Sequence, residues 1–436
     1  MTGVRARTRA GGDSLFAVPG FAAVYSVGVV WSLCRWAIGF LGAYVVAEAT
    51  GSPRLVQLTG AMLWAPLLVA GVVGGALSDR APRRLLLLIQ FGVLGPLTVV
   101  VGLASLADRL PLWALYGYML TAGMGWVIDM TVRRALVYDL VGDHHVNRAM
   151  AFEGLASSVG LAGGALAGGT LIGTIGAPGA YLVVAAAIGV AAALLILVPS
   201  GPPTPATTIT APVQASSGRP SPRPSPEAVA ESPPATEGRG SLATEVRAGL
   251  SLVGRWPVLA SVLGVTALTN FFHFSYFPIV PVIADLLAAS PQATGALAAA
   301  TGLGMAVGST VVLRFPGRRG VAYIVGSAGA FVFLLGFAAF DSYWPVFASL
   351  FVASSFVGMF GATQSALVMT SVGPEVRGRA MGLLSMAIGM LPLGMAALGE
   401  MAEVFGPRPA LIVSNVVGLI GLALFLWRRP EALRVR

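Results

Sequence analysis

Ionisable side chains within long apolar stretches are the residues in this sequence best suited to chemistry. Arg35 lies in the first such stretch, Asp129 in the fourth and His273 in the seventh, whereas Glu153 lies near the start of the fifth. A charge that faces lipid is costly, so an ionisable group at depth usually faces a cavity or a partner. The set therefore indicates proton movement or internal ion pairing. No nucleophile–base pair or phosphate-binding loop accompanies it to suggest an enzyme.

Arg35 and Asp129 are expected to lie close enough to interact. At a rise of 1.5 Å per residue, Arg35 is roughly 22 Å and Asp129 roughly 14 Å from the inner membrane surface. An arginine side chain spans most of that difference. The two form either a structural ion pair or a coupling pair, in which separation of the charges lets Asp129 take up a proton. Glu153, at a shallow depth, either snorkels to the inner surface or joins the same pathway.

An aromatic-rich stretch surrounds His273 in the seventh apolar segment. Residues 270–278 read Asn-Phe-Phe-His-Phe-Ser-Tyr-Phe-Pro. Asn270 and His273 are candidates for the same polar pathway, but a lone histidine among aromatic rings more often serves as a hydrogen-bonded packing residue. The rings either form a wall for an apolar ligand or pack against one another. Pro278 and Pro281 each remove a helix hydrogen bond and predict a bend in this segment.

The elements that position these side chains are predicted to be membrane-spanning helices. The chain has 436 residues, of which 56% are hydrophobic and only 10% charged, and its mean hydropathy is +0.82. A soluble domain of this length needs more polar surface, and a span takes about 20 apolar residues. Twelve such segments are predicted, near residues 21–47, 55–77, 85–106, 112–137, 149–174, 179–198, 257–286, 292–313, 320–340, 344–370, 380–403 and 409–427.

The placement of the basic residues predicts the orientation of these spans. All 27 are arginines; with the N-terminus inside, Arg54, Arg109 and Arg408 lie outside, Arg35 lies within the first span, and the other 23 are on the inside. Because arginine is favoured in cytoplasmic loops, both termini are expected to be cytoplasmic, in a bacterial inner membrane. The net charge of +9 does not indicate nucleic-acid binding, since the arginines lie mostly in short loops between apolar segments.

A proline-rich stretch divides the spans into two groups of six. Ten of the 29 prolines lie between Pro202 and Pro234, mixed with Ser, Thr, Ala and Gly. Such a segment cannot bury a core and is expected to be a disordered linker. A short amphipathic helix from Ser241 onwards, or simply the first turn of the seventh span, follows it. The predicted organisation is a six-helix bundle over residues 1–198, a cytoplasmic linker over 199–256 and a second six-helix bundle over 257–436.

The two groups of spans are related by an internal repeat. At an offset of 231 residues, eight of the sixteen positions in 135–150 are identical to their counterparts in 366–381. A repeat of six spans places the halves about an axis along the membrane normal, and proteins built in this way bind their ligand near the bilayer midplane, between the halves. The repeat therefore predicts a central site.

A charged turn joins the second and third spans. It runs from Gly74 to Arg84 and is either an ordinary basic loop or a signature. It resembles the loop between helices 2 and 3 of the major facilitator superfamily, written G-x-L-a-D-r-x-G-r-[RK], although Pro82 replaces the second glycine. The residues that fit this pattern are Gly75, Leu77, Asp79, Arg80, Arg83 and Arg84. The resemblance implies that Asp79 docks against the N-terminus of the eleventh span and steadies an outward-facing state.

A second motif lies in the fifth span. Gly160, Gly164, Ala165, Gly168 and Gly169 resemble the antiporter motif of superfamily exporters, written G-x3-G-P-x2-G-G, with alanine in place of proline. Glycines four residues apart share a helix face and allow close packing, so a generic packing seam is the other interpretation. The equivalent positions of the second half do not keep the stripe. This asymmetry favours export over import.

The resemblance covers nearly the whole chain. The segments Arg-Ala-Leu-Val-x-Asp-Leu-Val at 134–141 and Val-Arg-Gly-Arg-Ala-Met-Gly-Leu at 376–383 resemble the branch that holds bacterial enterobactin- and macrolide-type exporters. This implies an all-α fold of twelve transmembrane helices in two six-helix pseudo-repeats. It also implies a cavity lined by spans 1, 4, 7 and 10, and gating by the residues of the two motifs.

The function that the resemblance implies is proton-coupled efflux of a small amphipathic molecule by alternating access. A monomer is expected, with the substrate, protons and lipid as its partners and with no cofactor or metal. The single cysteine, Cys34, excludes a disulfide framework. Two other functions stay open, since a fold does not fix a function. One is an importer or facilitator on the same fold, and the other is a membrane sensor or scaffold that does not transport.

Overall fold

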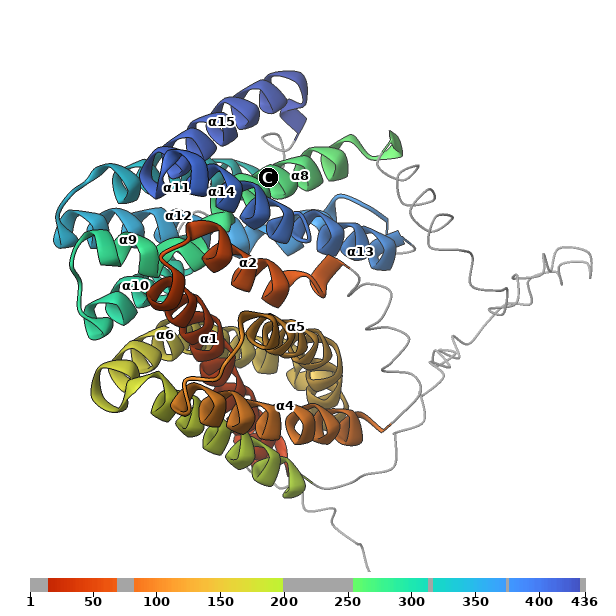
Figure 1. Cartoon of the computed structure of the whole chain (residues 1–436). Helices are drawn as coiled ribbons and strands as arrows, with labels where there is room; N and C mark the ends of the chain where they lie inside the picture. Colours follow the sequence, from red (N-terminus) through yellow and green to blue (C-terminus); the bar gives the residue numbers. More distant parts are fainter. Residues whose placement is uncertain (1–14, 69–81, 199–253, 313–316, 374–375, 432–436) are drawn as a thin grey trace, which may run out of the picture.

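The computed structural model describes residues 15–68, 82–198, 254–312, 317–373 and 376–431, which are helical and contain no strand. Figure 1 shows the helices of the first half below those of the second half, with α2 lying against the upper group. The first half contains η1 (Leu15–Ala17), α1 (Phe21–Thr50), α2 (Pro53–Trp64), α4 (Arg83–Leu106), α5 (Leu112–Ile128), η2 (Asp129–Arg133) and α6 (Arg134–Ile196). The second half contains α8 (Pro257–Leu268), η4 (Thr269–His273), η5 (Phe274–Ile279), α9 (Val280–Leu286), α10 (Pro291–Val312), α11 (Arg319–Ala339), α12 (Tyr343–Thr370), α13 (Arg377–Ile388), α14 (Leu391–Phe405) and α15 (Pro407–Arg428).

The longest helix, α6, contains two glycine breaks. Gly142 and Gly176 have positive φ angles of 64° and 74°, a conformation that glycine adopts readily because it lacks a Cβ atom. The breaks divide α6 into three parts. They fall between the predicted spans at 112–137, 149–174 and 179–198, so α6 carries the inner end of the fourth span and the whole of the fifth and sixth.

Nine helical stretches of the described residues are long and apolar enough to cross a membrane. One of them, Arg148–Ile196, contains two predicted spans. Two others are too short to count alone, since α2 has 12 described residues and α5 has 17 before η2 begins. The count of twelve therefore stays a prediction.

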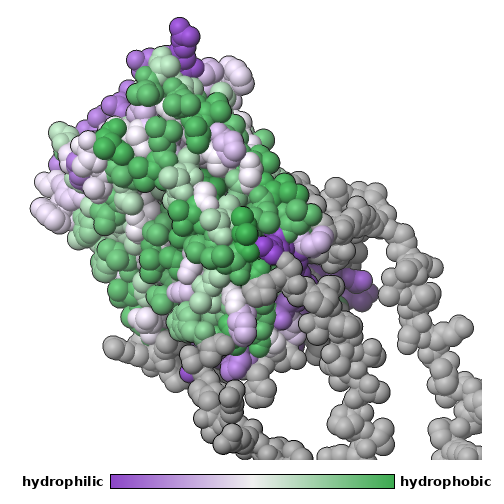
Figure 2. Space-filling view, turned by 90° about the horizontal axis from the view of Figure 1, so that it is seen from below, coloured by the Kyte–Doolittle hydropathy of each residue, from purple (hydrophilic) through white to green (hydrophobic). Residues whose placement is uncertain are grey.

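The exposed surface has the character of a lipid-facing one. Figure 2 shows apolar residues over most of the visible face and polar residues gathered toward its ends. On α4, five apolar side chains are each more than half exposed: Ile89, Val93, Val100, Leu103 and Leu106. An apolar surface of this extent is unusual on a soluble monomer, whereas lipid covers it at no cost.

Each half has its own buried core. The core of the first half is built from residues between Leu15 and Val198, including the fully buried rings of Trp31 and Phe91. The second half has two clusters, one around Tyr323 and one around Tyr276. A smaller cluster joins the halves, since Ala61 of the first half packs with Leu391 and Met395 of the second.

The halves meet where α6 packs on α10 and α2 packs on α14. A Cβ atom on Gly169 would lie only 2.7 Å from the Cα atom of Gly295, so glycine allows this close approach. At the other contact, Ser52 Oγ donates a hydrogen bond of 2.7 Å to Glu403. These two contacts lie toward the helix ends predicted to be outside, and α6 and α10 stay in contact as far as Ala162 and Gly302, near the middle of their predicted spans.

Several predicted segments lie outside the described residues. The linker predicted over 199–256 is described only from residue 254 onward, and its short helix is not among the described elements. Of the signature loop, Gly75, Asp79 and Arg80 fall within residues 69–81, which the structure does not describe. Their roles, and the division into domains, stay predictions.

Candidate functional site

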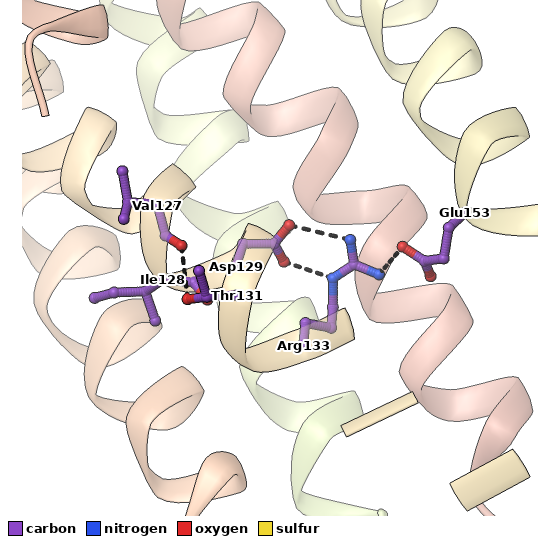
Figure 3. A network of polar contacts seen from close by, with 6 residues as sticks. All are labelled: Val127, Ile128, Asp129, Thr131, Arg133 and Glu153. Atoms are coloured by element: carbon purple, nitrogen blue, oxygen red, sulfur yellow. Dashed lines mark hydrogen bonds and ion pairs between the residues drawn. The ribbon is translucent and has the colours of Figure 1, made fainter. Parts of the chain in front are cut away.

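A buried cluster of three charged residues lies within the first half. Asp129 Oδ1 accepts a hydrogen bond of 2.5 Å from Arg133 Nε, and its Oδ2 accepts one of 3.0 Å from Nη2. Arg133 Nη1 donates to Glu153 Oε2. Figure 3 shows the two carboxylates approaching the guanidinium from opposite sides. All three side chains are 6% exposed or less, so the bridge from η2 to α6 is closed to lipid and solvent.

The geometry corrects two predictions. The partner of Asp129 is Arg133, not Arg35, and Glu153 is a buried member of the cluster rather than a residue that snorkels to the surface. Arg133 is among the 23 arginines that the sequence places on the inside of the membrane. The signal that could have identified it is the i,i+4 spacing in Asp-Met-Thr-Val-Arg, which places an acid and a base on one helix face.

Local backbone features make room for the cluster. Residues 129–133 form a π-helical turn, η2, which continues from α5 into α6, and such turns are frequent at functional sites. On α1, a Cβ atom at Gly28 would lie 2.4 Å from Arg133 Nη1. Glycine at this position therefore lets the guanidinium reach Glu153. Glu153 Oε1 is buried and has no hydrogen-bond partner among the described residues.

Arg35 is held by aromatic rings. It is 7% exposed, and its Cζ atom lies 4.1 Å from the ring centroid of Trp126 and 5.4 Å from that of Trp36. Such cation–π contacts are favourable, more so where water is excluded. Within the described ranges, no hydrogen bond or ion pair joins Arg35 to a carboxylate.

An apolar pocket lies between the two halves. The empty space in it, which includes open solvent at its mouth, is about 600 Å³. Trp36 and Trp64 line it from the first half, and Phe277 and Pro278 line it from the second. The Trp64 and Phe277 rings are nearly parallel, with an interplanar angle of 6° and centroids 6.5 Å apart. Part of the aromatic stretch at 270–278 thus forms a wall.

His273 and Asn270 lie away from this pocket. His273 is fully buried and packs edge-on against Phe274, Tyr276 and Phe331. Neither of its ring nitrogens has a hydrogen bond to another described residue. Asn270 Nδ2 donates 2.9 Å to the carbonyl oxygen of Thr266. Neither residue contacts the charged cluster, and their place in a pathway stays a prediction.

The glycine stripe of the fifth span forms a packing seam. A Cβ atom at Gly160 would lie 1.9 Å from Ser32 Oγ on α1, and one at Gly164 would lie 2.5 Å from the Leu33 carbonyl oxygen. Gly168 faces Phe40 in the same way. The seam holds α6 against α1, while Gly169 faces the other half. A gating role for these residues is compatible with this geometry and stays a prediction.

The two described arginines of the signature loop tie helix ends together. Arg83 Nη1 donates to the Ala135 carbonyl oxygen at 2.8 Å and also pairs with Asp139. Arg84 Nη2 donates to the Ile196 carbonyl oxygen at 2.6 Å. Both contacts lie within the first half, at the end predicted to be cytoplasmic. Among the described residues, no group of three or more His, Cys, Asp or Glu side chains could hold a metal ion.

Comparisons with known proteins agree with this architecture. The sequence matches the Major Facilitator Superfamily over residues 24–259 and 262–436. The enterobactin exporters EntS of Shigella boydii serotype 4 and Citrobacter koseri are each 25% identical to it over 416 residues, which cover 94% of this chain and 91% of theirs.

Solved structures share the fold. A bacterial homolog of the human lysosomal transporter Spinster, inward-facing and unoccupied, superposes with a TM-score of 0.70 at 16% identity, covering 95% of this chain and 97% of that one. A D-xylose-proton symporter gives a TM-score of 0.66 at 17% identity, with coverage of 94% and 98%. The predictions of an all-α transport protein and against an enzyme are confirmed. The chain belongs to the major facilitator superfamily, whose members carry small molecules across membranes.

Proposed function

We propose that this protein exports a small amphipathic molecule with an aromatic part, by alternating access coupled to protons. The observation that carries the proposal is the aromatic pocket between the halves, to which Trp64 and Phe277 contribute parallel rings from opposite halves. A ligand in this pocket contacts both halves at once, so it can bias their relative position. Export is supported by the enterobactin exporters that are 25% identical over most of the chain.

The proposed proton carrier is Glu153 rather than Asp129. Both oxygens of Asp129 accept hydrogen bonds from Arg133, whereas Oε1 of Glu153 has no partner among the described residues. That oxygen is the atom of the cluster on which a proton can be carried without displacing a hydrogen bond of Arg133. A movement of α6 relative to η2 would separate Glu153 from Arg133 and favour proton uptake.

The proposal includes the membrane arrangement predicted from the sequence. The chain acts as a monomer in a bacterial inner membrane, with both termini on the cytoplasmic side. Six-helix bundles over 1–198 and 257–436 are joined by the linker at 199–256. With this orientation, the contacts between Ser52 and Glu403 and between Gly169 and Gly295 close the outer end, and the structure corresponds to an inward-facing state.

The test is uptake into inverted membrane vesicles with an acidic lumen. The probes are enterobactin, erythromycin and an amphipathic aromatic dye, in a host that lacks its own exporters. We expect at least one probe to accumulate only while the pH gradient lasts, and nigericin to release it. Glu153→Gln should bind the probe but lose the acceleration by the gradient. Downhill equilibration without accumulation would instead indicate a facilitator, and absence of flux for every probe a non-transporting protein.

A further inference from the structure

We infer that Arg35 binds a negatively charged group of the substrate, so that the transported molecule is an aromatic anion. The inference rests on the proposed function and adds the chemical class of the substrate. It starts from the contrast between two buried arginines: Arg133 pairs with two carboxylates, whereas Arg35 has ring contacts and, among the described residues, no hydrogen bond or ion pair to a carboxylate.

Arg35 has unused hydrogen-bond donors in a buried position. A guanidinium has five N–H donors, and a buried donor without a hydrogen bond is costly. Arg35 Nε is enclosed and makes no hydrogen bond within the described part of the chain. Asp129, the partner expected from the sequence, uses both its oxygens on Arg133. Arg35 therefore keeps most of its hydrogen-bonding capacity for a group that is not part of the protein.

Arg35 also lies beside the pocket. Its guanidinium lies over the ring of Trp126, whose centroid is 4.0 Å from that of Trp64 and 5.7 Å from that of Trp36. Trp36 and Trp64 line the pocket. The cation is thus one ring beyond the pocket lining. For an acidic group of a molecule in the pocket to reach Arg35, the ring of Trp126, which is itself buried, must turn aside.

The guanidinium of Arg35 is held in place by its ring contacts. Its Cζ atom lies over the rings of Trp126 and Trp36, which restrict its movement. A planar guanidinium presents a fork of donors that suits carboxylate, sulfonate or phosphate oxygens. Because the group is already ordered, little rotamer entropy is lost when an anion binds.

The test compares two probes that share one aromatic body. The anion 1-anilinonaphthalene-8-sulfonate and the neutral N-phenyl-1-naphthylamine differ only in the sulfonate. Binding is measured by quenching of tryptophan fluorescence, with the protein in phosphatidylcholine nanodiscs and with empty nanodiscs subtracted. A charged hydrogen bond in a buried site corresponds to about tenfold or more in affinity. We expect the anion to bind at least about tenfold more tightly than the neutral probe.

Variants of Arg35 test whether this residue causes the preference for the anionic probe. In Arg35→Gln the ratio of the two affinities should fall toward one, with the neutral probe bound as in the wild type. Arg35→Lys should keep part of the preference. Arg109→Gln, at an exposed position predicted to lie outside, should keep all of it. Equal affinities in the wild type, absence of anion binding, or an unchanged ratio in Arg35→Gln would each overturn the inference, and the wild-type comparison holds even if a variant does not fold.

The two proposals fail in different ways. If neutral dyes accumulate in the vesicles under a pH gradient while the wild type shows no preference for the sulfonate, export stands and the anion site is refuted. If the sulfonate is preferred through Arg35 but nothing accumulates, the binding chemistry stands and transport is refuted.

Discussion

At the scale of single residues, Arg133 is the organising charge of the first half. It binds one carboxylate from η2 and one from α6, and the two differ in how fully they are satisfied. Asp129 accepts two hydrogen bonds from the guanidinium, whereas Glu153 accepts one and has a second oxygen with no partner in the described part of the chain. The inequality suggests a division of roles, in which Asp129 fixes the orientation of Arg133 and Glu153 changes its protonation state.

Stability measurements on two isosteric variants test this division. Each variant removes one carboxylate charge from Arg133 and keeps one oxygen that can accept from it. In Asp129→Asn the amide nitrogen must also replace an oxygen that accepts from Arg133, so we expect the larger loss, about 3–5 kcal/mol. In Glu153→Gln the amide nitrogen can take the place of Oε1, which has no partner among the described residues, so we expect a loss of about 1 kcal/mol. The single cysteine, Cys34, is buried, so the reaction of a thiol-reactive coumarin dye on heating reports unfolding. Equal losses in the two variants, or a larger loss for Glu153→Gln, would contradict the assignment.

At the scale of the elements, close helix packing controls how the halves meet. On α6, successive glycines serve different neighbours: Gly160, Gly164 and Gly168 face α1, and Gly169 faces α10. The same helix therefore belongs to the first half through one face and to the junction through another. The junction also depends on the small size of Gly295 on α10, since the backbones approach too closely there for a side chain.

One substitution tests the junction. A Cβ atom at Gly169 would lie 2.5 Å from the Pro291 carbonyl oxygen, against ordinary contacts of 3.4–4 Å. Gly169→Ala should therefore push α6 and α10 apart by roughly 1 Å and favour opening at the outer end. Spin labels at Arg109→Cys and Ser342→Cys, in a Cys34→Ala background, should report a shift to longer distances. Gly189→Ala is the control, because a Cβ atom there meets nothing within 4 Å; the same shift in both variants would count against the explanation.

The helices and their contacts differ in how well they could be predicted from the sequence. The helices were predictable because about 20 apolar residues in a row have few alternatives in a membrane, and glycine and proline mark where they bend. The π-helical turn at Asp129–Arg133 was not predicted, since it depends on contacts with α1 and α6. The prediction that Arg35 is the partner of Asp129 was wrong. The depth of two residues along their helices does not say which side chains face each other. Only part of the aromatic wall could be predicted. Phe277 belongs to the aromatic-rich stretch visible in the sequence, whereas Trp36 and Trp64 are far apart in the sequence and come together only in the fold.

At the scale of the whole molecule, the described contacts between halves define one conformational state. The polar contacts across the halves, from Ser52 and Arg54 to Glu403 and from Gln57 to the Ser275 carbonyl, lie toward one end in the part of the chain that is described. In alternating access, an intermediate is closed at one end and has its binding pocket between the halves. The structure has both features. The opposite state must break these contacts, and a ligand that binds both halves can contribute the energy.

The charge carried in one cycle follows from the two proposals together. Exchange of one proton for one monovalent anion moves two charges in the same electrical direction, whereas a neutral substrate moves one. Each charge gains about 2.3 kcal/mol per 100 mV, so about 60 mV gives about tenfold for each charge. In inverted vesicles, the protein takes up the anion and releases a proton from the lumen. A lumen-positive potassium potential of about 60 mV, set with valinomycin, should therefore raise the steady-state accumulation of the sulfonate probe by about 100-fold, against about tenfold for a neutral dye. Accumulation that ignores the potential would show that the exchange is electroneutral and would exclude a proton-for-anion cycle.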